Sequence, residues 1–108
     1  MELIPSDSAI GDEIIAQVYR SNLEELRDVH AMTKEPRAPV LDATKLDLVR
    51  TLVGGVLETL ESRSPNGRKE LIQAANLSYS ATVLGIILYK DATASPKVPR
   101  PRAQAATR

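Results

Sequence analysis

Apolar residues recur at helical spacing along the first third of the chain. Between residues 8 and 35 they fall on one face of a helix with a period near 3.6 residues. Ser8 is expected to cap the start of this helix, and Pro36 and Pro39 to end it, because the residue before a proline is pushed out of the helical region. The residues on this face are Ile10, Ile14, Val18, Leu26, Val29 and Met32.

The second stretch, residues 42–63, has the clearest separation of apolar and polar positions. Asp42 is expected to cap the helix, and charged side chains lie on the face opposite the apolar one. The apolar face is formed by Leu46, Val49, Val53, Val56 and Leu60 and is widened by Leu48, Leu52 and Leu57.

The third stretch, residues 66–91, follows a turn signature at 64–67, Ser-Pro-Asn-Gly. Its central part, residues 71–89, contains 19 residues without a charge, and the half from Ala81 to Tyr89 has almost no polar face. A helix that is apolar on one stripe lies on a surface, whereas one that is apolar all round must be enclosed.

These patterns predict an all-α protein with three long helices in an antiparallel up-down arrangement, because the helices have similar lengths and short connections. No segment has the alternation of a strand. Residues 1–94 form the predicted helical domain, and residues 95–108 form a Pro/Arg-rich tail that cannot bury apolar area. Two one-sided helices cannot enclose the end of the third, so we expect self-association to complete the fold.

Small residues follow one narrow stripe of the third helix at spacings of four, three and four. Such residues let another helix backbone approach closely, either within the same chain or from a second copy, and we favour the second copy. The predicted oligomer interface consists of Ala74, Ser78, Ala81, Leu84, Gly85 and Leu88.

Three further features leave alternatives open. Asn22 projects into the apolar face of the first helix, where it either fixes the packing register or lines a solvated gap, and we favour the gap. Gly54 and Gly55 lie inside the second helix, either at a close helix crossing or at a tolerated weak point. The 71–89 stretch is long enough to span a membrane. Gln73, Asn76 and other polar residues in its first half count against a membrane as partner, which we keep as a minor alternative.

Composition excludes several kinds of chemistry. The chain has no cysteine and one histidine, His30, so a thiolate site or a disulfide framework cannot form. Nucleotide-binding glycine motifs and the nucleophile-elbow motif do not occur. We therefore expect no catalytic residues, no metal site, no cofactor and no enzymatic activity.

The net charge of zero hides an uneven distribution. Residues 1–94 carry 14 acidic and 10 basic side chains, whereas the tail carries four basic side chains and no acidic one. Basic residues on a helix face or a tail can contact phosphates. The candidate nucleic-acid contacts are Arg20, Arg27, Lys34, Lys45, Arg50, Lys97, Arg100, Arg102 and Arg108.

The sequence thus predicts a non-enzymatic small helical protein that acts through protein–protein contacts, as a self-associating subunit or adaptor of a larger assembly. The alternative is a dimeric helical protein that binds an RNA or DNA duplex, as some viral and plasmid proteins do. A minor alternative is a subunit of a membrane complex, inserted through residues 71–89. The acidic start lacks the long apolar run of a signal peptide, so we expect a cytoplasmic or other intracellular location.

Overall fold

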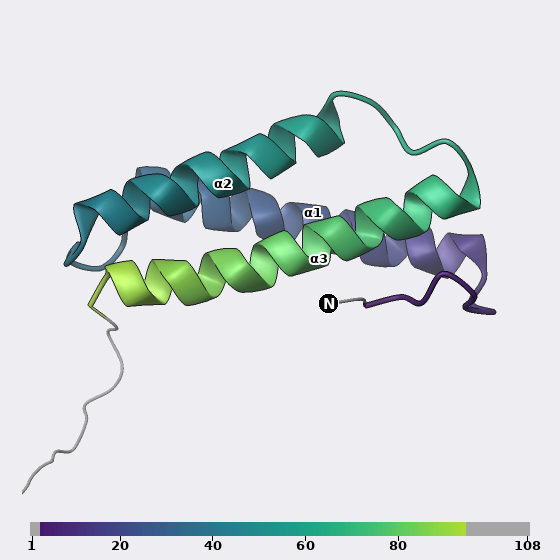
Figure 1. Ribbon diagram of the computed structural model, residues 1–108, viewed down its shortest axis with the longest axis horizontal. Helices are drawn as coiled ribbons and strands as arrows, with labels where there is room; N and C mark the ends of the chain where they lie inside the picture. Colours follow the sequence, from purple (N-terminus) through teal and green to yellow (C-terminus); the bar gives the residue numbers. More distant parts are fainter. Residues whose placement is uncertain (1–2, 95–108) are drawn as a thin grey trace, which may run out of the picture.

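The computed structural model, which describes residues 3–94, contains three helices that lie side by side (Figure 1). Helix α1 spans Asp12–Lys34, α2 spans Ala43–Glu61 and α3 spans Gly67–Ala92. The chain runs up, down and up again, so that α2 is antiparallel to both neighbours (Figure 1). The all-α prediction of three long helices is confirmed, and residues 3–94 contain no strand beyond one isolated bridge between Val40 and Thr93.

The expected side-chain cap forms at one of the three helix starts. Asp42 caps α2 as predicted, because its carboxylate accepts a hydrogen bond of 3.0 Å from the backbone N–H of Lys45. At the start of α3, Gly67 has a φ of +88°, which favours glycine. The predicted cap at Ser8 is wrong: α1 begins at Asp12, with Gly11 as the N-cap residue.

The core lies between the three helices and is built mainly from aliphatic side chains. Ile15 and Leu26 from α1 and Val49 and Val53 from α2 are completely buried. Gly85 of α3 lies against Val53 and against Val29 of α1: a β-carbon there would be 2.9 Å from Cγ2 of Val53. The absence of a side chain at Gly85 therefore leaves room for these two valines.

Asn22 corrects our expectation of a solvated gap. Its side chain is buried between α1 and α3, and its Nδ2 donates a hydrogen bond of 3.2 Å to the carbonyl of Ala75. Ser78 Oγ donates to the same carbonyl at 2.9 Å. The buried amide of Asn22 finds its hydrogen-bond acceptor at one position of α3, the carbonyl of Ala75. This bond therefore favours one alignment of α1 along α3.

The connection between α1 and α2 is fastened to the end of α3. The backbone N–H groups of Leu41 and Asp42 both donate to the carbonyl of Ala92, at 2.8 and 3.0 Å, and the N–H of Ala94 donates to the carbonyl of Pro39. The hydroxyl of Tyr89 accepts from the N–H of Arg37. These bonds satisfy a carbonyl that the helix end would otherwise leave free.

Candidate interaction surface

The small-residue stripe of α3 lies inside the single chain. Ala74, Ser78, Ala81 and Gly85 are all buried against α1 and α2. The close approach at Gly85 is made by Val53 of α2 and Val29 of α1, so the chain's own helices account for the stripe. The prediction that these four residues meet a second copy is therefore corrected: they fill space within the bundle.

Larger apolar residues of α3 remain exposed to solvent. Leu77, Leu84 and Ile87 are 41%, 46% and 51% exposed, and Leu88 is half-buried at the edge of the core. Leu77, Ala81, Leu84 and Leu88 recur at spacings of four, three and four, which places them in one row beside the buried stripe. Two predicted interface residues, Leu84 and Leu88, thus lie where a partner can reach them.

A second row of apolar residues runs along α2 on the same side. Leu48 and Leu52 are 60% and 36% exposed, and Val56 and Leu60 follow at spacings of four. Val56 and Leu88 pack against the same core cluster, and Leu60 and Leu77 line one open cavity. The two rows therefore border the groove between α2 and α3. We call the exposed surface formed by Leu48, Leu52, Leu77, Leu84 and Leu88 the leucine face.

The leucine face was only partly predictable. Leu48 and Leu52 were expected to widen the buried side of α2, but this side faces two neighbours only, and the outer edge stays in water. The usable signal was the 4-3-4 spacing of Leu77, Ala81, Leu84 and Leu88, which is the spacing of a helix-packing seam. This row lies next to the small-residue stripe, which has the same spacing.

Helix α3 also has the length and composition of a membrane-crossing segment. Its most apolar window of 18 residues has a mean hydropathy of 1.5, and 39% of that window is buried inside the structure. In its first half, Asn76 Nδ2 donates to the carbonyl of Ile4, and Ser78 Oγ donates to the carbonyl of Ala75 in the preceding turn of the same helix.

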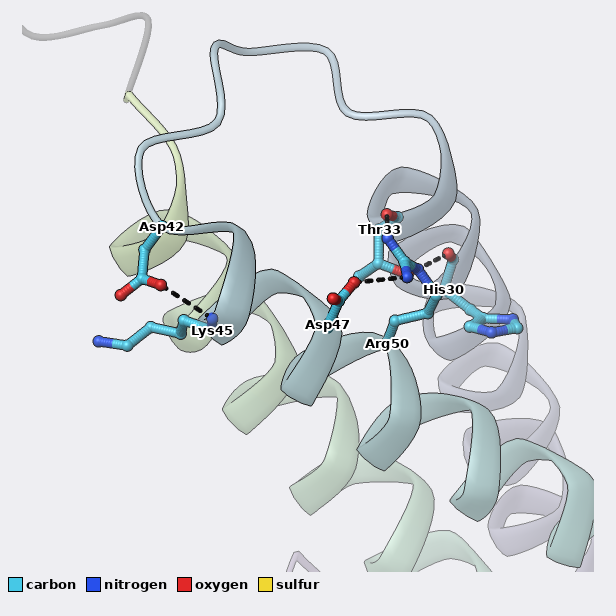
Figure 2. A network of polar contacts seen from close by, with 6 residues as sticks. All are labelled: His30, Thr33, Asp42, Lys45, Asp47 and Arg50. Atoms are coloured by element: carbon cyan, nitrogen blue, oxygen red, sulfur yellow. Dashed lines mark hydrogen bonds and ion pairs between the residues drawn. The ribbon is translucent and has the colours of Figure 1, made fainter.

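Two of the basic residues considered for nucleic-acid contacts form ion pairs. Arg27 lies 2.6 Å from the carboxylate of Glu61. Arg50 donates to Asp47 at 2.7 Å and to the carbonyl of Thr33, at the end of α1, at 3.2 Å (Figure 2). Arg50 thus ties α2 to the carbonyl end of α1, where a positive charge suits the helix dipole.

The other basic candidates are spread over the surface. Arg20 and Lys34 are exposed on α1, and Lys45 is half-buried at the start of α2. Figure 2 shows the Lys45 side chain pointing away from Arg50. Lys97, Arg100, Arg102 and Arg108 lie outside the described residues. The described helices consequently do not gather these cations into one patch.

His30 packs beside Gly54 and lines an open cavity of about 450 Å³ with Glu58 and Glu61. Burial, followed by the positive charges of Lys34 and Arg50, lowers the pKa of His30 below its usual value. The contact with His30 also explains why residue 54 is a glycine: a β-carbon there would be 3.0 Å from His30 Nε2. Gly55, in contrast, is open to solvent.

Other titratable groups have structural surroundings. Burial raises the pKa of Tyr19, and the backbone N–H of Asn66 together with the Arg63 guanidinium lowers the pKa of Glu70. No three His, Asp or Glu side chains in residues 3–94 gather in an arrangement that could hold a metal ion.

Comparisons with protein-family models, with curated proteins and with solved structures give no match to this chain.

Proposed function

We propose that this protein is a non-enzymatic helical subunit that works through protein–protein contacts and pairs with a second copy of itself across the leucine face. The observation that carries the proposal is the pair of exposed apolar rows on α2 and α3. Contiguous exposed apolar area that spans two elements is typical of an interaction site, whereas scattered single residues are not.

A second copy is the simplest partner for this surface. In a two-fold symmetric pair the same patch contributes from both sides, so each exposed leucine counts twice. Complete burial of a leucine side chain stabilises by about 1.5–3 kcal/mol. Because Leu84 and Leu48 are about half exposed in one chain, pairing would bury the remainder of each in both copies.

The test is the particle mass in solution, measured by sedimentation equilibrium. The full chain is expected to sediment as a dimer or a higher oligomer. Leu84→Asp places a charge on the leucine face and is expected to weaken association by about 30-fold or more. Gln17→Asp is the matched control, because it adds the same charge at an exposed position of α1, which contributes no residue to this face.

A chain that remains monomeric at micromolar concentration would contradict the proposal. Equal weakening by Leu84→Asp and Gln17→Asp would also contradict it, since the effect would then come from charge and not from the face. A chain that enters detergent micelles and stays in solution only there would instead support a membrane role for α3.

A further inference from the structure

The segment before α1 lies against the bundle. In Figure 1 the described start of the chain runs alongside the first turns of α3 before it turns back into α1. Ile4 is only 4% exposed and belongs to the core cluster that contains Ile15, Ile72 and Ala75. A residue that precedes the first helix by eight positions thus completes the packing between α1 and α3.

Asn76 holds the backbone of this segment at one residue. Its Oδ1 accepts from the N–H of Ile4 at 2.7 Å, and its Nδ2 donates to the carbonyl of Ile4 at 2.9 Å. One side-chain amide therefore satisfies both polar groups of a single peptide residue. Main-chain hydrogen bonds with a pocket for the side chain are how proteins bind extended peptides.

Charge complementarity extends the contact along the segment. The Arg68 guanidinium donates to the carbonyl of Ser8 and to the carboxylate of Asp12. An open cavity of about 470 Å³ lies beside these contacts and is lined by Ser6, Arg68, Lys69, Ile72, Gln73 and Asn76. The basic start of α3 thus contacts both the end of this segment and Asp12, the first residue of α1.

The connection to α1 is short and exposed, and only Arg68 bridges it, through Ser8 and Asp12. Ala9, Ile10 and Gly11 are exposed, and the space around Gly11 is open. A short exposed connection beside a self-contained contact is the arrangement in which identical chains exchange a segment. Exchange preserves every contact at Ile4, because the segment from a second copy carries the same residues.

We propose that the groove bounded by Ile15, Ile72, Asn76 and Arg68 is a binding site for an extended peptide with a branched aliphatic residue. In the self-associated protein it takes residues 3–8 of a second copy. The site itself stands on the contacts of Ile4 and Asn76, whereas the exchange between copies rests on the proposed self-association.

The groove is tested with the full chain carrying Ile4→Asp, which empties the pocket of its own occupant. A fluorescent peptide of residues 3–10 is titrated and its anisotropy measured. We expect saturable binding to this variant and weaker binding to the unchanged chain, whose own segment competes. A peptide carrying Ile4→Asp, or the double variant Ile4→Asp/Asn76→Leu, should bind about tenfold more weakly.

Circular dichroism of each variant checks that the helices are retained, and Ile4→Ala replaces Ile4→Asp if they are not. The proposed peptide site is overturned if neither folded Ile4 variant binds the peptide saturably. It is also overturned if the double variant with Asn76→Leu binds the peptide as tightly as the single Ile4 variant does. Peptide binding is also measured in a Leu84→Asp background. Retained binding there with lost self-association supports the groove and contradicts only the exchange.

Exchange between copies is tested by mixing two full-length chains. One carries Ile4→Asp and has an intact groove, and the other carries Asn76→Leu and has an intact segment. Only a mixed pair can form the contact, so energy transfer between labelled chains should report mixed pairs above the random fraction. Mixed pairs at the random fraction overturn the exchange.

Discussion

Two neighbouring faces of α3 carry opposite kinds of residue: one packs inside the bundle, and the other lies at its edge beside α2. The inner side has Ala74, Ser78, Ala81 and Gly85, all buried, while the outer side has Leu77, Leu84 and Leu88, which are exposed or half-buried. Small residues let the helices approach, and the approach leaves no room for leucines between them. The large side chains are therefore displaced to the rim of the groove, where one chain cannot cover them.

This difference separates folding from association. A change on the inner side alters the packing of one chain, because the nearest atoms belong to α1 and α2. A change on the outer side alters what that chain presents to a partner. Hydrophobic burial drives both processes, so the position on the helix decides which one responds.

The largest effect is expected from Gly85→Leu. The added side chain would start 2.9 Å from Cγ2 of Val53 and 3.1 Å from Cγ1 of Val29, both in buried valines that cannot move aside. Overpacking here should lower the free energy of unfolding by about 3 kcal/mol or more, measured by urea denaturation. Gly85→Ala should cost about 1–3 kcal/mol.

Gly55→Ala is the control for Gly85→Ala. Gly55 also lies inside a helix, but the space around it is open. Alanine there should raise the free energy of unfolding by about 0.5–1 kcal/mol through its better helix propensity. Destabilisation of similar size in both variants would show that the contact at Gly85 is not tight.

The next largest effect is expected on the leucine face, from Leu52→Asp. Leu52 belongs to the α2 row of the leucine face and is 36% exposed. If the face spans both helices, this variant should weaken association by about tenfold or more in sedimentation equilibrium. Association unchanged in Leu52→Asp but lost in Leu84→Asp would restrict the interface to α3.

Asn22→Ala tests the inner side at its polar position. It removes the hydrogen bond to the carbonyl of Ala75, which Ser78 Oγ continues to contact. The expected loss is about 1–2 kcal/mol in the free energy of unfolding, measured by urea denaturation. Sedimentation equilibrium should show unchanged association for the folded protein, and an altered dimer constant would mean that the seam also shapes the outer surface.

The sequence predicts the helices well because each has its own periodicity, and Asp42 and Pro36 mark ends by local chemistry. It does not predict which copy covers α3. The stripe ending at Gly85 is compatible with a neighbour in the same chain or in another, and only the distance to Val53 decides between them. The contact of Ile4 with Asn76 spans 72 positions, so no local pattern reveals it.

The smallest effect concerns pH and His30, on the far side of α2 from the leucine face. Burial, then Lys34 and Arg50, lower the pKa of His30 below 6.5, while Glu61 opposes them. Between the lowered pKa and 6.5 the unfolded chain binds more protons than the folded one, so stability falls as pH decreases through this interval. Above pH 6.5 this dependence of stability on pH vanishes.

His30→Gln should flatten the dependence of stability on pH, measured as the urea midpoint at pH 7.5 and pH 5.5, with association of the folded chain unchanged. An equal slope in both proteins would assign the dependence to other groups, and loss of association at pH 5.5 would connect the two sides of α2.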